Sequence, residues 1–143
     1  MVTQTKTADQ TVDAGRALAK KMSGGELLLL TGELGSGKTT FVKGLAQGLG
    51  VKEDVRSATF LLMTPYSAHK QLTFVHVDGY RLTKPDEVRS IGLQDYLGRP
   101  DVVVAIEWPQ RLKPMIEKLK MKSEKLYEVT FETINEEARR ISY

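Results

Sequence analysis

The chain has 143 residues, of which 41% are hydrophobic and 27% charged, as in an ordinary globular protein. It contains no cysteine, which excludes disulfides, thiolate metal sites and cysteine nucleophiles. The two histidines, His69 and His76, do not form an HExxH pattern. A zinc hydrolase built on histidines and a serine triad with a histidine base are therefore not expected.

The net charge and the length of the apolar runs indicate what kind of protein to expect. The 21 basic and 18 acidic residues give a net charge of +3, which a solvated surface explains. The start of the chain lacks the basic and apolar regions of a signal peptide, and the longest aliphatic runs, Leu27–Leu30 and Val102–Ile106, are only long enough for strands. We expect one domain over residues 1–143, in a cytoplasmic protein that has neither a membrane nor DNA as a partner.

Apolar periodicity and glycine positions predict alternating helices and strands. Thr7 followed by Gln10 resembles a capping box, and apolar residues then recur at helical spacing. The polar turn 67–71 would join its two flanking strands into a hairpin if it is tight. The expected elements are a helix at 8–22, a strand at 26–31, a helix at 39–49, strands at 60–66 and 72–77, a short helix at 85–91, a loop or helical turn at 92–98, a strand at 101–107, a helix at 109–122 broken or kinked at Pro114, and strands at 127–133 and 138–143. The predicted fold class is α/β, with a mixed parallel and antiparallel central sheet flanked by helices.

The segment Gly32–Thr39, GELGSGKT, fits the pattern GxxxxGK[ST] at every fixed position. It lies between an expected buried strand and an amphipathic helix, where backbone N–H groups can surround a phosphate. Gly35 and Gly37 allow the backbone conformations that this requires, Lys38 can bring its charge to the β- and γ-phosphates, and the Thr39 hydroxyl can ligate Mg²⁺. The alternative is a plain glycine-rich turn, but such a turn has no need of Lys-Thr. The loop predicts a site for a nucleoside triphosphate.

Two acidic residues follow expected buried strands. Asp78 comes after the strand 72–77, and Glu107 ends the strand 101–107. Ligands of open α/β sheets bind beyond the carboxyl ends of the strands, so either acid could hold Mg²⁺ or orient the attacking water. The alternative for each is an acid that caps the next segment. Glu33, inside the loop, either faces solvent or brings negative charge near the γ-phosphate.

The segment Ser57–Phe60 lies between the helix after the glycine-rich loop and the first strand of the hairpin. The Thr59 hydroxyl could sense the γ-phosphate there, as switch segments do. An ordinary strand start predicts the same residues, so both interpretations stand.

Five segments together resemble the small bacterial P-loop ATPases of the TsaE (YjeE) family, which are needed to make threonylcarbamoyl-adenosine in tRNA. The phosphate loop alone is generic, whereas HxDxYRL followed by EWP is much more specific. The segments appear in the family's order over residues 32–109. They are GELGSGKTT (32–40), SATF (57–60), HVDGYRL (76–82), GLQDYL (92–97) and IEWP (106–109).

The resemblance implies a single-domain P-loop NTPase fold and an Mg²⁺-dependent ATPase. Such an ATPase would bind the TsaB–TsaD synthase pair, support its repeated turnover and reach tRNA only through that complex. By position, the resemblance implies that Thr39 and Glu107 are the Mg²⁺ ligands. No guanine-reading Asn-Lys-x-Asp segment occurs, and ATP is favoured over GTP largely by the resemblance. The implied catalytic residues are Lys38, Thr59, Asp78 and Glu107, and the implied nucleotide-binding residues are Gly35, Ser36, Gly37, Lys38, Thr39 and Thr40.

Other positions match the family without a defined role. Trp108 resembles the aromatic residue that the family has beside the nucleotide or the partner surface, and ordinary packing is the alternative. Tyr80 and Arg81 also match the family motif and would face either the partner or the nucleotide. The sequence departs from the family pattern at Glu33 (often aspartate), Ala58 (often proline) and Gly79 (often leucine). The departures at Glu33 and Ala58 remove no ligand, whereas Gly79 affects how rigidly Asp78 and Tyr80 are held.

Two other classes of function are alternatives. A small-molecule or polynucleotide kinase could use the same loop with Asp78, although it would also need an acceptor pocket and a lid carrying arginines. A non-catalytic RNA-binding module could use the basic segment after Ile116, although no RRM, KH or zinc-knuckle signature occurs.

Overall fold

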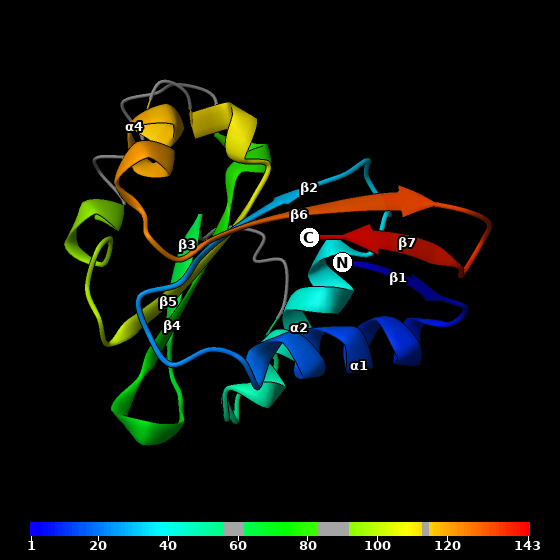
Figure 1. Ribbon diagram of the computed structural model, residues 1–143, viewed down its shortest axis with the longest axis horizontal. Helices are drawn as coiled ribbons and strands as arrows, with labels where there is room; N and C mark the ends of the chain where they lie inside the picture. Colours follow the sequence, from blue (N-terminus) through cyan, green and yellow to red (C-terminus); the bar gives the residue numbers. More distant parts are fainter. Residues whose placement is uncertain (56–61, 83–91, 113–114) are drawn as a thin grey trace.

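The central element of the protein is a seven-stranded sheet in the order β1-β7-β6-β2-β5-β4-β3 (Figure 1). The computed structural model describes residues 1–55, 62–82, 92–112 and 115–143. Strands β6, β2, β5 and β4 run parallel to one another, whereas β1, β7 and β3 pair antiparallel with their neighbours, so the sheet is mixed as predicted. The strands are β1 (Val2–Thr5), β2 (Leu27–Thr31), β3 (Met63–Ser67), β4 (Thr73–Asp78), β5 (Val102–Glu107), β6 (Leu126–Thr133) and β7 (Arg139–Ser142).

Apolar side chains alternate between the two faces of the central strands. In β2, Leu28 and Leu30 belong to the apolar cluster on one face, and Leu27 and Leu29 to the cluster on the other. Every residue of β5 is buried. A strand covered on both faces needs apolar side chains at nearly every position, which explains why these uninterrupted aliphatic runs form the middle of the sheet.

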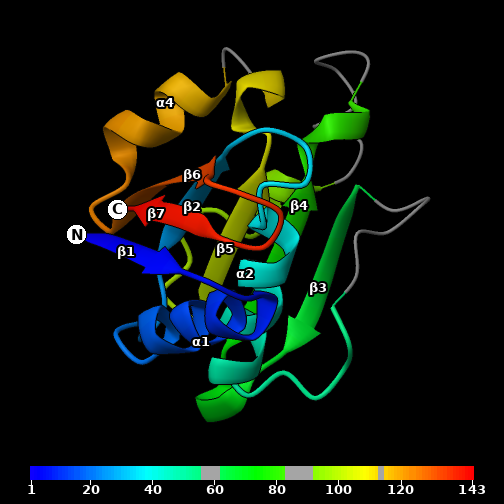
Figure 2. The same cartoon turned by 90° about the vertical axis from the view of Figure 1, so that its right-hand side faces the viewer.

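Helices cover both faces of the sheet (Figures 1 and 2). Helices α1 (Ala8–Ala19) and α2 (Lys38–Gly48) pack on one face. Helix α4 (Met115–Lys122) and the 3-10 turn Pro109–Leu112 pack on the other. No helix within the described ranges is long and apolar enough to cross a membrane.

Glycines allow α1 and α2 to approach closely. A Cβ at Gly44 of α2 would lie 1.9 Å from the Val12 carbonyl oxygen of α1. A Cβ at Gly15 of α1 would lie 2.2 Å from the Phe41 carbonyl oxygen of α2. Because real Cβ atoms never come this close to a backbone oxygen, the spacing of the two helices depends on both glycines.

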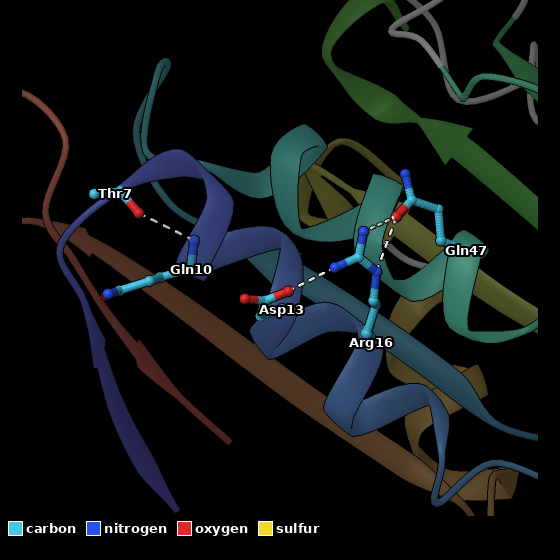
Figure 3. Close-up of polar contacts among 5 residues, drawn as sticks. All are labelled: Thr7, Gln10, Asp13, Arg16 and Gln47. Carbon is cyan, nitrogen blue, oxygen red and sulfur yellow. Dashed lines mark hydrogen bonds and ion pairs between the residues drawn. The ribbon is translucent and has the colours of Figure 1, made fainter.

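Polar contacts define the start of α1 and the edge of its contact with α2 (Figure 3). The Thr7 hydroxyl caps α1 by accepting a 3.2 Å hydrogen bond from the Gln10 N–H, as the capping pattern predicts. Arg16 donates from Nε to the Gln47 side-chain oxygen of α2 at 3.0 Å and also pairs with Asp13. Arg16 therefore links the two helices at their exposed edge.

The structure contains one strand that the sequence pattern did not predict. Strand β1 is short and polar, and of its residues only Thr5 is buried. It is a strand because it pairs antiparallel with β7, from Val2 opposite Ser142 to Thr5 opposite Arg139. A strand this short that forms by pairing with a distant segment need not show an alternation of apolar and polar residues. The sequence pattern therefore does not predict β1.

The predicted helix at 109–122, which was expected to be broken or kinked at Pro114, is confirmed as an α-helix only in its second part. A 3-10 turn occupies Pro109–Leu112, and α4 spans Met115–Lys122. The first helix ends at Ala19 rather than residue 22. The predicted helix at 85–91, Pro114 and residues 60–61 of the first hairpin strand lie outside the described residues. The remaining predicted strands and the helix 39–49 are confirmed to within a few residues.

Replacing Gly44 by alanine tests the close contact of α1 and α2. In an open helix, alanine is more stable than glycine by about 1 kcal/mol. Here the added Cβ meets the Val12 backbone, so we expect a loss of about 1–3 kcal/mol of unfolding free energy, measured by urea denaturation. Lys43→Ala, one position earlier in α2, is the control and should change stability by less than about 0.5 kcal/mol. An unchanged or raised stability of Gly44→Ala would contradict the contact.

Candidate active site

Two carboxylates stand side by side at the carboxyl end of the central strands. Strands β4 and β5 pair in parallel with Asp78 opposite Glu107. On the other side of β5, Leu30 of β2 is opposite Glu107, and the chain leaves β2 one residue later. The glycine-rich loop therefore starts beside both acids, at the sheet edge where α/β proteins bind their ligands.

The glycine-rich loop turns directly into α2. Gly35 and Gly37 have φ angles of 76° and 97°, in the left-handed region that glycine adopts without strain. Gly37 is the N-cap of α2 and has no side chain with which to cap it. The N–H groups of the first turn, which begins at Lys38, are thus available to a ligand, and the helix dipole favours an anion there.

The Lys38 side chain is buried and hydrogen-bonded to the backbone of the loop. It is only 5% exposed, and its ammonium donates to the carbonyl oxygens of Gly32 and Glu33, the latter at 2.9 Å. Burial lowers the pKa of Lys38 below its ordinary value of 10.5, although the nearby Glu107 and Asp78 carboxylates act in the opposite direction. The lysine is held by groups that a phosphate could replace.

Glu107 accepts hydrogen bonds from two other elements. The Thr39 hydroxyl, in the first turn of α2, lies 3.0 Å from Oε1 and 3.2 Å from Oε2 of Glu107. The Nε2 atom of His76, on β4, lies 2.6 Å from Oε2. The carboxylate is only 4% exposed, so these hydrogen-bond partners compensate for most of the hydration that it loses on burial.

An aromatic pair borders the lysine. Trp108, directly after β5, has a φ of 57°, a conformation that costs a residue with a side chain about 1–3 kcal/mol. Its ring centroid lies 4.2 Å from the Lys38 Nζ, a cation–π contact, and 5.1 Å from the ring centroid of Tyr80. The guanidinium of Arg111 lies 5.6 Å from the Tyr80 ring. The strained backbone at Trp108 thus places its indole beside the loop.

These groups surround one cavity of about 340 Å³. The loop, the first turn of α2, the carboxyl ends of β4 and β5 and the start of β7 all contribute to its walls. The lining residues are Leu34, Gly35, Ser36, Gly37, Lys38, Thr39, Thr40, Asp78, Tyr80, Glu107, Trp108 and Arg139.

Arg139 comes from the C-terminal strand and was not foreseen. Its Nη2 donates to the Gly35 carbonyl oxygen at 2.9 Å across 104 positions of the sequence. Its Nε is buried and finds no hydrogen-bond acceptor within the described part of the chain. No sequence pattern connects residues so far apart, so only the fold could place a guanidinium on the loop.

The structure brings most of the predicted site residues together, while their roles stay predictions. The six predicted nucleotide-binding residues, 35–40, line the cavity together with Asp78 and Glu107. Thr59 lies outside the described residues. Glu33 is exposed and is not among the lining residues, which favours the interpretation that it faces solvent. The sequence pattern assigns His76 no role at this site, although its position two residues before Asp78 on one strand indicates that both side chains share a face.

Gly79 is tightly packed between the two strand ends. A Cβ at this position would lie 2.6 Å from the Trp108 carbonyl oxygen and 2.9 Å from that of Glu107. The N–H of the next residue, Tyr80, donates to the Asp78 carboxylate at 3.0 Å. The departure from the family pattern at Gly79 therefore coincides with a close backbone contact in which a side chain has no room.

The cavity fits a nucleotide with a bound cation. The uncapped turn of α2, the Lys38 ammonium and the orphaned Arg139 Nε are all donors suited to phosphate oxygens. The Thr39 hydroxyl and Glu107 oxygens are 3.0 Å apart, close to the roughly 2.9 Å between neighbouring oxygen ligands on Mg²⁺. Within the described ranges, no three His, Asp or Glu side chains cluster in a way that could hold a metal. A cation that draws its remaining ligands from phosphates and water is the kind that suits this site.

Comparisons with known proteins point to one family. The family model described as "Threonylcarbamoyl adenosine biosynthesis protein TsaE" matches residues 5–141. A protein of Treponema pallidum with the name "tRNA threonylcarbamoyladenosine biosynthesis protein TsaE" is 39% identical over 107 residues, which are 75% of this chain and 77% of that protein. Proteins with the same name from Nostoc sp. and Borreliella burgdorferi are 38% and 29% identical, over 73% and 94% of this chain and 65% and 93% of their own lengths.

A solved structure agrees in fold. The crystal structure of Bacillus subtilis YdiB superposes with a TM-score of 0.68 and 25% identity, covering 99% of this chain and 82% of that one. The matched region of the family model runs from the end of β1 into β7 and includes the glycine-rich loop and both strand-end acids. The chain therefore belongs to the TsaE family of threonylcarbamoyl-adenosine biosynthesis proteins.

Proposed function

We propose that the protein binds and hydrolyses ATP with Mg²⁺, as an accessory ATPase of tRNA threonylcarbamoylation. The observation that carries the proposal is that Lys38 and Thr39, at the start of α2, share one cavity with Asp78 and Glu107. The cavity thus combines donors for phosphate with carboxylates that can hold a cation. A triphosphate with a divalent cation presents the complementary charges.

Each residue of the cavity has a role in this proposal. The N–H groups of the first turn of α2 and the Lys38 ammonium bind and orient the phosphates. Thr39 and Glu107 hold Mg²⁺, which when bound neutralises charge on the phosphates and orients them. Asp78, beside Glu107, orients the attacking water. The Trp108 ring covers the lysine and excludes other water from it, and the Tyr80 ring packs against Trp108.

We also propose that the TsaB–TsaD synthase pair is the partner of the protein. The family is named for threonylcarbamoyl-adenosine biosynthesis, the modification that this pair would synthesise. Two residues that line the cavity, Leu34 and Tyr80, are 69% and 43% exposed. A protein that covered these apolar side chains would lie directly over the nucleotide, so its binding and ATP hydrolysis would be coupled.

Lys38→Met tests nucleotide binding. Methionine keeps most of the length of the side chain and removes the charge. We expect ATP affinity, measured by isothermal titration, to fall about 10–100-fold, the effect of losing a charged hydrogen bond worth roughly 1.5–3 kcal/mol. Lys43→Ala in the same helix is the control. If Lys38→Met bound ATP as tightly as the unaltered protein does, the proposed role of the loop in nucleotide binding would be wrong.

Glu107→Gln tests the cation site. The amide keeps the shape of the side chain and loses its charge, so the Mg²⁺ concentration for half-maximal phosphate release should rise about 10-fold or more. Binding of ATP in EDTA should be retained, since the phosphate donors are intact. Glu132→Gln on the exposed part of β6 is the matched control. An unchanged Mg²⁺ requirement in Glu107→Gln would contradict its role as a ligand.

A pull-down with the TsaB–TsaD pair, with and without ATP, tests the partner. We expect capture to depend on ATP and the bound protein to release free phosphate faster than the isolated protein. Leu34→Ser should weaken capture, because it removes an exposed apolar side chain from the cavity mouth. Met121→Ser on α4, which is 89% exposed, is the control. Equal capture of both variants, or a phosphorylated acceptor in place of free phosphate, would count against the proposal.

A further inference from the structure

His76 is a buried histidine to which the proposed function gives no role. It lies on β4 and is 4% exposed, as is Glu107 on β5. Its Nε2 lies 2.6 Å from Oε2 of Glu107. An ionised carboxylate only accepts hydrogen bonds, so Nε2 carries the hydrogen of this contact.

The contact is built into the central strands rather than into a loop. In the parallel pairing of β4 and β5, His76 is opposite Ala105 and Asp78 is opposite Glu107. Residues two positions apart on a strand share a face, so the His76 and Glu107 side chains are diagonal neighbours on the face that α2 covers. Both ends of the hydrogen bond are thus fixed by backbone pairing.

The two oxygens of Glu107 are held differently. The Thr39 hydroxyl is within hydrogen-bond distance of both, and it lies closer to Oε1, at 3.0 Å, than to Oε2, at 3.2 Å. His76 contacts Oε2. A donor on Oε2 restricts rotation of the carboxylate and keeps Oε1 towards the hydroxyl of Thr39.

We propose that His76 is a positioning residue for Glu107. By donating from Nε2 to Oε2, it holds the carboxylate so that Oε1 and the Thr39 hydroxyl can ligate one cation together. The inference rests on the proposed function, which makes Glu107 a cation ligand. Partners that orient a ligand without touching the metal affect metal affinity more than nucleotide affinity.

Three variants separate this role from simple packing. His76→Leu keeps a buried side chain and removes the donor, His76→Gln restores an N–H at a similar distance along the side chain, and His76→Asn carries an amide too short to reach Oε2. The readouts are the Mg²⁺ requirement of ATP hydrolysis, Mn²⁺ binding to the ADP complex by electron paramagnetic resonance, and ATP affinity in EDTA. We expect the leucine and asparagine variants to weaken both metal readouts about 10–100-fold and to leave ATP affinity in EDTA unchanged. The glutamine variant should recover most of the metal affinity.

Val77→Ala controls for lost stability. Val77 is buried on the same strand and belongs to the apolar cluster on the opposite face, away from Glu107. If Val77→Ala weakens metal binding as much as His76→Leu, or if His76→Gln is as impaired as His76→Leu, His76 only supports the fold and the inference is wrong. Should His76→Leu fail to fold, the glutamine and asparagine variants are compared instead. Equal metal affinity in these two variants would likewise show that the inference is wrong. If the unaltered protein binds no ATP, the proposed function itself fails and the inference falls with it, an outcome distinct from a failure confined to His76.

Discussion

The parallel pairing of β4 with β5 places Asp78 directly opposite Glu107, and the rest of the site depends on this register. A slip of one residue would turn Glu107 to the other face of the sheet, into the apolar cluster that contains Ile106 and Val104. Burying this carboxylate among apolar side chains, away from Thr39 and His76, would cost several kcal/mol, and that cost opposes the slip. The packing that stabilises the sheet therefore also fixes the distance between the two carboxylates.

Around this rigid pair, the site contains features that would be unfavourable elsewhere. The Lys38 ammonium is buried, Trp108 has a positive φ and the Arg139 Nε has no acceptor among the described residues. Burial of charge, backbone strain and unpaired donors each cost free energy. They persist because the sheet and the two helices packed through glycines hold them in place, and a bound anion would satisfy the donors. Such local exceptions are typical of ligand sites.

The parts of the site that could be predicted are those encoded by neighbouring residues. The loop motif requires only the residue order from Gly32 to Thr39, and the strand-end acids follow from where apolar runs stop. His76 was missed because its partner, Glu107, is 31 positions away, and Arg139 because its contact with the loop spans 104 positions. The strand β1 was missed for the same reason, since it exists through its pairing with β7.

The amino-acid sequence by itself determined the α/β class, the glycine-rich loop between β2 and α2, and the two acids, because local periodicity and residue type are sufficient for each. Only the tertiary structure decided which acid meets Thr39, which histidine holds that acid, and that an arginine from the last strand lies on the loop. These relations depend on strand order and register, which arise from the burial of the whole sheet. The lack of cysteine and the presence of only two histidines excluded several chemistries, and the fold then brought the remaining polar groups to one edge of the sheet.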